Sequence, residues 1–250
     1  MAEQGGVGII QPLTLLAIWF EMASGNWMGY QYNFLLKLPV YECYREGKVL
    51  VPGSVEYQTM CKPSYFCQKN DVEYSVVKDD SLSLNNWIED FDLTCESNLV
   101  ISFFSMCYII GILLGFMLLP FFQDRYGRKK VFCTAIFVTS LILLGDTILP
   151  RKNSSKWVIY ILDIIFGMMS SCRFSTGYNY VVELWPSKNL SVSGSLIHFL
   201  EGIIIIVIAC FYMFVSKNWR PLFLYGAISG FAFLALNIFL IPDSPKWLYS

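Results

Sequence analysis

One short segment reads Asp124-Arg125-Tyr126-Gly127-Arg128-Lys129-Lys130, and five of its seven side chains are charged. It separates two long apolar segments, residues 99–122 and 131–149. Each segment has about the 20 residues that an α-helix needs to cross roughly 30 Å of hydrocarbon. The connection is too short for a soluble domain, so it is expected to form a hairpin between two membrane helices. Its dense basic charge places it on the cytoplasmic side.

The composition is that of a membrane protein. Of the 250 residues, 55% are hydrophobic and 15% are charged, whereas soluble domains carry about a quarter charged residues. The net charge of −1 argues against a nucleic-acid partner. The first ten residues hold no Lys or Arg, so neither a secretory signal nor a transit peptide is predicted there. The first apolar segment is therefore expected to remain as a helix.

The apolar pattern predicts an all-α membrane protein with six transmembrane helices in one domain, residues 1–250. The expected spans are approximately 10–36, 99–122, 131–149, 157–182, 192–215 and 221–241. Gly111 and Gly115 lie four residues apart in the second span. Small residues at this spacing allow two membrane helices to approach closely.

A polar loop, residues 37–98, separates the first two spans and is expected to form a small extra-membranous subdomain. Half of the chain's eight cysteines lie in it, namely Cys43, Cys61, Cys67 and Cys95. These four predict up to two disulfides, with three possible pairings, and therefore an oxidising compartment. Asn153, which begins an Asn-Ser-Ser sequence after the third span, is a glycosylation site if its loop faces the lumen.

Several motifs at the ends of the predicted helices resemble the major facilitator superfamily. The hairpin pattern Asp-Arg-x-Gly-Arg is similar to its signature. Trp87 to Glu96, Glu183-x-x-Pro186 and Pro242 to Leu248 are similar to motifs of the organic cation/anion transporter branch. The resemblance implies the amino-terminal six-helix half of a facilitator fold, a 3+3 inverted repeat, in a multi-pass integral membrane protein surrounded by lipid.

The resemblance also implies a cytoplasmic charge cluster that controls gating. Its members in this chain are Asp124, Arg125, Gly127, Arg128, Glu183 and Asp243. The sequence departs from the family pattern at three places. Pro120 stands where the family has a glycine, and Asp163 and Leu190 stand where it has arginines. Two cations of the cluster are therefore missing.

Polar and aromatic residues inside the predicted helices are candidates for binding a substrate: Glu21, Arg173, Phe174, Tyr178, His198 and Glu201. Ionisable groups are costly in hydrocarbon and usually face a cavity or a partner. His198 and Glu201 are three residues apart and share one helix face. The ionisable residues either bind a substrate or a proton, or they have only a structural role. In the structural alternative, Arg173 forms a buried pair with Glu21 or Glu201 and this pair locks helices together. The two aromatic residues either bind an organic cation through their faces or serve only in packing.

Neither a metal-ligand cluster nor a glycine-rich phosphate loop nor a nucleophile–base pair is present in the sequence, so neither an enzyme nor a cofactor is expected. Two functions remain open. The first is transport of organic ions or similar solutes by alternating access, together with a second six-helix half. The second is a structural role, as a transporter-derived subunit of a larger membrane complex. Either function predicts that the polar central face meets another six-helix half or a different membrane subunit.

Overall fold

The computed structural model describes residues 27–240 apart from 70, 79, 81, 151, 153, 154 and 185–189, and also residues 12 and 16. Five helices in this part of the chain are long and apolar enough to cross a membrane. They are α5 (Asn98–Tyr126), α6 (Arg128–Ile148), α7 (Lys156–Leu184), α8 (Leu190–Phe214) and α9 (Arg220–Leu240). Residues 27–35 are also helical and fall within the first predicted span. The total of six helices stays a prediction.

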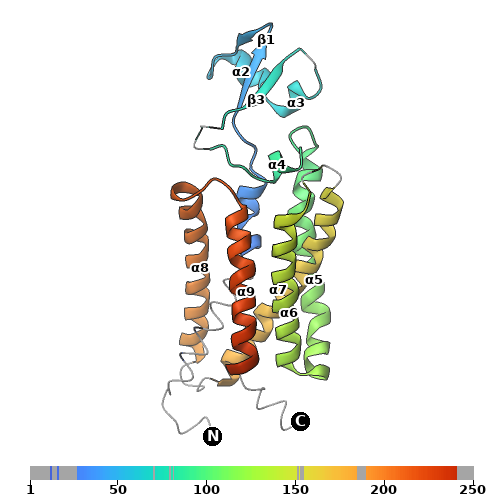
Figure 1. The fold of residues 1–250 in the computed structure, drawn as a ribbon, viewed down its shortest axis with the longest axis vertical. Coiled ribbons are helices and arrows are strands. Elements are labelled where there is room, and N and C mark those ends of the chain that lie inside the picture. The colour runs from blue at the N-terminus through green and yellow to red at the C-terminus, as the bar shows by residue number, and fades with distance from the viewer. Residues whose placement is uncertain are drawn as a thin grey trace.

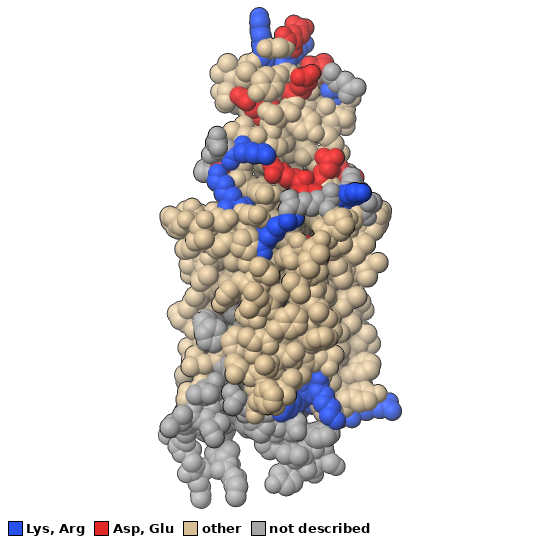
Figure 2. Space-filling model, in the orientation of Figure 1, with Lys and Arg blue, Asp and Glu red and all other residues tan. Residues whose placement is uncertain are grey.

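The long helices run side by side as one bundle (Figure 1). On the face shown in Figure 2, charged side chains gather at the two ends of the bundle and are absent from the band between them. This distribution is typical of a protein whose middle is surrounded by lipid. Below, the end that carries the β-strands is called the sheet end, and the end with the Gly127 turn is called the hairpin end.

A single residue, Gly127, joins α5 to α6 at the hairpin end. Its φ angle of 89° is positive, a conformation that favours glycine because it has no Cβ. The Gly127 N–H donates to the carbonyl of Gln123 at 3.1 Å, and α6 begins at the next residue. The predicted tight hairpin between two long helices is therefore present.

Small residues bring α5 and α7 into close contact. A Cβ added to Gly111 would collide with the backbone carbonyl of Ile164, and one added to Gly115 would collide with Ser171. From the opposite side, Gly167 of α7 meets the carbonyl of Tyr108 in the same way. The predicted close approach at the Gly111–Gly115 pair is thus confirmed, with α7 as the partner helix.

The cysteine-bearing loop contains a small β-sheet, so the expectation of a purely helical fold was wrong there. Strands β1 (Tyr41–Arg45), β2 (Lys48–Val49) and β3 (Glu73–Val76) pair antiparallel in the order β2-β1-β3. Two short helices, α2 (Val55–Met60) and α3 (Pro63–Phe66), complete this unit (Figure 1). Each strand has five residues or fewer, which is too short for a clear alternation of apolar and polar residues.

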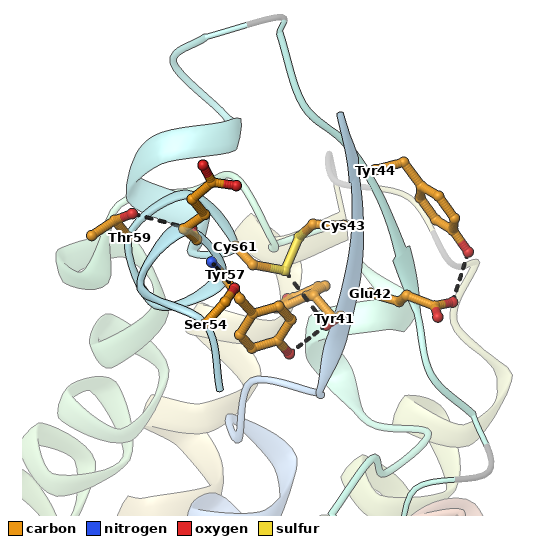
Figure 3. The surroundings of a disulfide bond; sticks show 9 residues. Tyr41, Glu42, Cys43, Tyr44, Ser54, Tyr57, Thr59 and Cys61 are labelled. Atoms are coloured by element: carbon orange, nitrogen blue, oxygen red, sulfur yellow. Dashed lines mark hydrogen bonds between the residues drawn. A yellow bond between two sulfur atoms is a disulfide. The ribbon is translucent and has the colours of Figure 1, made fainter. Parts of the chain in front are cut away.

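Two disulfides stabilise the sheet unit, which confirms that the loop cysteines are paired. The pairs are Cys43 with Cys61 and Cys67 with Cys95. The structure thus selects one of the three possible pairings. Beside the first pair, the Tyr57 hydroxyl donates to the Tyr41 carbonyl at 2.8 Å and ties α2 to β1 (Figure 3). The unit has its own buried cluster, which includes Tyr41 and Phe66.

The last part of the predicted loop packs with the helix bundle. Helix α4 (Trp87–Asp90) places Trp87 and Ile88, both fully buried, in the cluster that the long helices share. At the end of the loop, Glu96 forms a 2.6 Å salt bridge with Lys156, the first residue of α7. Segment 83–96 therefore packs with the sheet end of the bundle, and Cys95 at its end is bonded to the sheet unit, residues 41–76.

Candidate functional site

A cavity of about 350 Å³ lies between the helical segment 27–35 and helices α5, α7 and α8. It is lined by Gly29, Tyr30, Tyr108, Ile112, Phe116, Ser170, Ser171, Phe174 and Glu201. The lining residues of α5, α7 and α8 come from the middle of each helix. The cavity is therefore about halfway between the sheet end and the hairpin end, at the depth of the bilayer centre.

Glu201 is the charged residue among those that line the cavity. The Tyr30 hydroxyl donates to its Oε1 at 2.6 Å, and Nδ1 of His198 lies 3.5 Å from its Oε2. Tyr30 and Glu201 are 171 residues apart in sequence, so this contact closes the helix array around the cavity. His198 and Glu201 face the same way because they are three residues apart on α8, as the sequence predicted.

Aromatic rings surround this carboxylate. Phe174 lies with its ring centroid 6.0 Å from that of His198. Tyr30, Tyr108 and Phe116 supply further rings to the lining. Rings near a carboxylate suit a bulky cation, because the face of an aromatic ring carries negative charge and attracts a cation within about 6 Å.

Arg173, although adjacent to Phe174, does not belong to this lining. Its side chain is buried and its Nη1 donates to Thr139 Oγ1 of α6 at 2.7 Å. Successive residues of an α-helix point about 100° apart, so one residue of this pair contacts α6 while the other reaches the cavity. The described ion pair of Glu201 is with His198, and Glu21 lies outside the described residues. A pairing of Arg173 with Glu21 or with Glu201 stays a prediction.

Tyr178 lies one helical turn beyond Phe174, toward the hairpin end. A Cβ added to Gly194 of α8 would lie 3.7 Å from the Tyr178 hydroxyl, so this side chain sits where α7 meets α8. It is not among the residues that line the cavity. Of the two aromatic candidates, only Phe174 reaches the cavity.

The predicted gating residues at the hairpin end are partly outside the described structure. Asp124 and Arg125 are exposed, and the Arg125 guanidinium lies 5.7 Å from the centre of the Tyr126 ring. Nearby, Lys129 Nζ donates to the Ile238 carbonyl at 3.1 Å and so connects α6 to α9. No side-chain position is described for Arg128's expected partners Glu183 and Asp243, nor for Asn153. The charge cluster and the glycosylation site stay predictions.

Sequence reasoning missed most of the cavity lining. Tyr108, Ile112 and Phe116 recur every four residues on α5, which is the spacing of one helix face. That spacing was available in the sequence. The role of Tyr30 was not, because only the packing of α8 against segment 27–35 places its hydroxyl on Glu201.

Comparisons with known proteins identify the family. A family model described as Major Facilitator Superfamily matches residues 84–249. The chain is 25% identical over 222 residues to a Xenopus tropicalis protein named "Solute carrier family 22 member 15-like", which covers 87% of this chain and 43% of that protein. It is 24% identical over 172 residues to "Organic cation transporter 1" of Caenorhabditis elegans, covering 69% of this chain and 28% of the relative.

A third relative, "Solute carrier family 22 member 2" of Rattus norvegicus, is 27% identical over 166 residues, which cover 65% of this chain and 28% of the relative. The chain thus matches less than half the length of each of these relatives. The family match covers most of the chain and includes the hairpin motif. Together with the apolar helices, it shows that this integral membrane protein belongs to the Major Facilitator Superfamily, in which it resembles the organic cation/anion transporter branch.

Proposed function

We propose that the chain is one six-helix half of a transporter that carries organic cations across a membrane by alternating access. The observation that carries this proposal is the mid-bundle cavity, in which aromatic rings surround Glu201. One of the relatives is named as an organic cation transporter, and this name supports the same class of substrate.

The size and chemistry of the cavity agree with a small cationic ligand. Its volume of about 350 Å³ is at the lower end of the range for small-molecule sites. An ionised carboxylate is costly near the bilayer centre unless a partner balances its charge. A bound organic cation supplies that balance, while Tyr30 holds the carboxylate in a fixed orientation.

A second six-helix half completes the site in this proposal. The side chain of His198 is 59% exposed, although it lies on α8 close to Glu201. In a lone chain this polar ring would face lipid at the depth of the cavity. In facilitator transporters the substrate lies between two six-helix halves, each a pair of inverted three-helix repeats. Such a second half would cover His198 and enclose the substrate.

The disulfides suggest the orientation of the chain in the membrane. Their persistence requires an oxidising compartment, so the sheet unit, residues 41–76, is placed on the extracellular or luminal side. The basic hairpin end is then cytoplasmic, in agreement with the positive-inside rule. The hairpin residues Asp124, Arg125 and Arg128 would form the cytoplasmic gate with Glu183 and Asp243.

Binding and uptake of a quaternary ammonium ion test this proposal. The chain is expressed with its native membrane partners, and a labelled tetraalkylammonium ion is compared with an uncharged analogue of the same shape. We expect saturable binding and uptake of the cation only. Glu201→Gln should weaken cation binding by about tenfold or more, equivalent to about 1.4 kcal/mol. Glu56→Gln, at an exposed position of the sheet unit, is the matched control.

Two results would contradict the proposal. One is a wild-type chain that is folded in native membranes but neither binds nor transports the cation. The other is equal cation affinity in the wild type and in the Glu201→Gln variant. The first result would favour the purely structural role instead.

A further inference from the structure

A second group of buried polar residues lies near the sheet end of the bundle. Asp146 is close to the end of α6, and Asp163 is in the second turn of α7. Their exposed fractions are 2% and 0%. Among the residues that the structure describes, neither carboxylate has a hydrogen-bond partner.

A third unpartnered group is directed toward this pair. The Tyr32 side chain is 7% exposed, and its hydroxyl has no hydrogen bond within the described part of the chain. It lies close enough to Asp163 to interact with it, and the two carboxylates are close enough to repel each other. Three buried polar groups from three helices thus lie within electrostatic range of one another.

No positive charge at the sheet end balances the two acids, as far as the described residues show. The other ionisable groups that act on Asp163 are Cys107 and Tyr108 of α5 and Tyr160 of α7, and none of these carries a positive charge. The basic residues at the starts of α7 and α9 bind other carboxylates. Lys156 pairs with Glu96 and Arg220 with Asp90.

Two ionised carboxylates cannot share a dry space of this kind at acceptable cost. Burial disfavours the charged form, and a second carboxylate nearby disfavours it further. A metal ion would need more ligands, because Mg²⁺ takes six and Ca²⁺ six to eight oxygens. No cluster of three or more His, Cys, Asp or Glu residues suited to a metal occurs in the described segments. A proton is the ligand that fits.

We propose that Asp146 and Asp163 form a proton-binding site, with Tyr32 as its third hydrogen-bonding member. A bound proton neutralises a carboxylate of the pair and so relieves the repulsion between them, and the Tyr32 hydroxyl donates to an oxygen of Asp163. When the helices separate, water reaches the pair and accepts the proton. The site does not depend on which solute, if any, the cavity binds.

Segment 27–35 connects this site to the cavity. Tyr30 donates to Glu201 in the cavity, and Tyr32 lies beside Asp163. Two residues apart on a helix, these side chains point about 200° apart, so one segment contacts both groups from opposite sides. A shift of this segment therefore changes the surroundings of Glu201 and of the aspartate pair together, which links proton release to the state of the cavity.

Infrared spectroscopy of the purified chain in an alkyl maltoside detergent, which has no ester groups, tests the site directly. A protonated carboxyl gives a C=O stretching band that ionised carboxylates lack, and the band shifts when H₂O is exchanged for D₂O. We expect this band at pH 7 in the wild type and a marked loss of its area in the double variant D146N/D163N. Asp71→Asn, at an exposed position outside the bundle, should keep the band unchanged.

If the double variant does not fold, the two single variants test the same proposal. Asp146→Asn and Asp163→Asn each leave one carboxyl, and each should change the position or area of the band. Absence of the band in the wild type at pH 7 would overturn the proposal, as would a band that neither single variant alters. The wild-type chain could instead lack the band and melt at a lower temperature when Na⁺ is replaced by K⁺, with no such change in D163N. That result would assign the site to a metal cation.

Discussion

The Trp219 indole Nε1 donates a 3.0 Å hydrogen bond to Oδ2 of Asp90, between residues 129 positions apart in sequence. The same carboxylate oxygen accepts from Arg220 Nη2 at 3.4 Å. Trp219 is also packed edge-on against Trp87, with ring centroids 6.0 Å apart. Through these contacts the short helix α4 fixes the start of α9, although α4 lies in the loop between segment 27–35 and α5.

Asp90→Ala is expected to destabilise the sheet end of the bundle. It removes the acceptor of a buried indole N–H, which costs about 1–3 kcal/mol when the donor is left without a partner. Thermal unfolding in detergent followed by tryptophan fluorescence measures the loss. Asp71→Ala, at an exposed position, should unfold at the wild-type temperature, and an equal effect of both variants would contradict the assignment.

Removal of the first disulfide should loosen the sheet unit and leave the helix bundle intact. The variant C43S/C61S is expected to lose about 2–4 kcal/mol of local stability. The effect is local because the buried cluster of the sheet unit is separate from that of the long helices. Hydrogen–deuterium exchange should quicken in residues 41–76 alone. Cys210→Ser, which removes no disulfide, is the control, and faster exchange throughout α5 and α7 would argue against two separate cores.

The contact between α5 and α7 predicts opposite outcomes for two Gly→Ala changes. Gly111→Ala places a methyl group against the Ile164 carbonyl and should cost about 1–3 kcal/mol through overpacking. Gly145→Ala on α6 adds its methyl to open space and should be neutral or slightly stabilising, because alanine is the better helix former by about 1 kcal/mol. Melting temperatures of the two variants measure this difference, and equal values would contradict the packing.

Phe174 is expected to contribute to binding of an organic cation. Loss of its ring in Phe174→Leu should weaken binding of a tetraalkylammonium ion by about fivefold to thirtyfold, which corresponds to the 1–2 kcal/mol of a partly desolvated cation–π contact. Phe199→Leu is the matched control, because this ring is 66% exposed and does not line the cavity. Equilibrium binding to native membranes distinguishes the two variants, and equal losses would remove Phe174 from the site.

Glu89 predicts a pH dependence of stability at the sheet end. Partial burial raises the pKa of Glu89; the positive charge of Lys78 lowers it, and the negative charge of Asp90 raises it further. The pKa of Glu89 is higher in the folded state than in the unfolded state. The stabilisation that the protonated side chain provides is therefore fully present at pH values below the unfolded-state pKa, and it is lost as the pH rises through the folded-state pKa. Glu89→Gln removes this loss, which is less than about 1 kcal/mol because the side chain is partly exposed and its charge is screened.

Melting temperatures measured from acidic to neutral pH check this sign. The Glu89→Gln variant should match the wild type at acidic pH and melt higher than the wild type at neutral pH. Glu73→Gln, on exposed strand β3, is the matched control. A variant that melts lower than the wild type at neutral pH would show that ionised Glu89 stabilises the fold.

The long apolar helices, the tight hairpin and the presence of disulfides in one loop could all be predicted from the sequence. These features follow from local information. The thickness of the bilayer sets the length of an apolar span, and Gly127 alone permits the backbone conformation that ends α5. The family was also readable, because its motifs are short and lie at the helix ends.

The tertiary structure alone decided which of these residues meet. It shows how the four loop cysteines pair, and it shows that α4 packs in the core of the bundle. It also shows that Phe174 lines the cavity, whereas Arg173 binds Thr139 of α6. It also placed the Tyr30 hydroxyl on Glu201 and brought Asp146 close to Asp163. Apolar periodicity specifies that a helix forms, but the direction in which each side chain points depends on how helices distant in sequence pack together, and that packing decides these contacts.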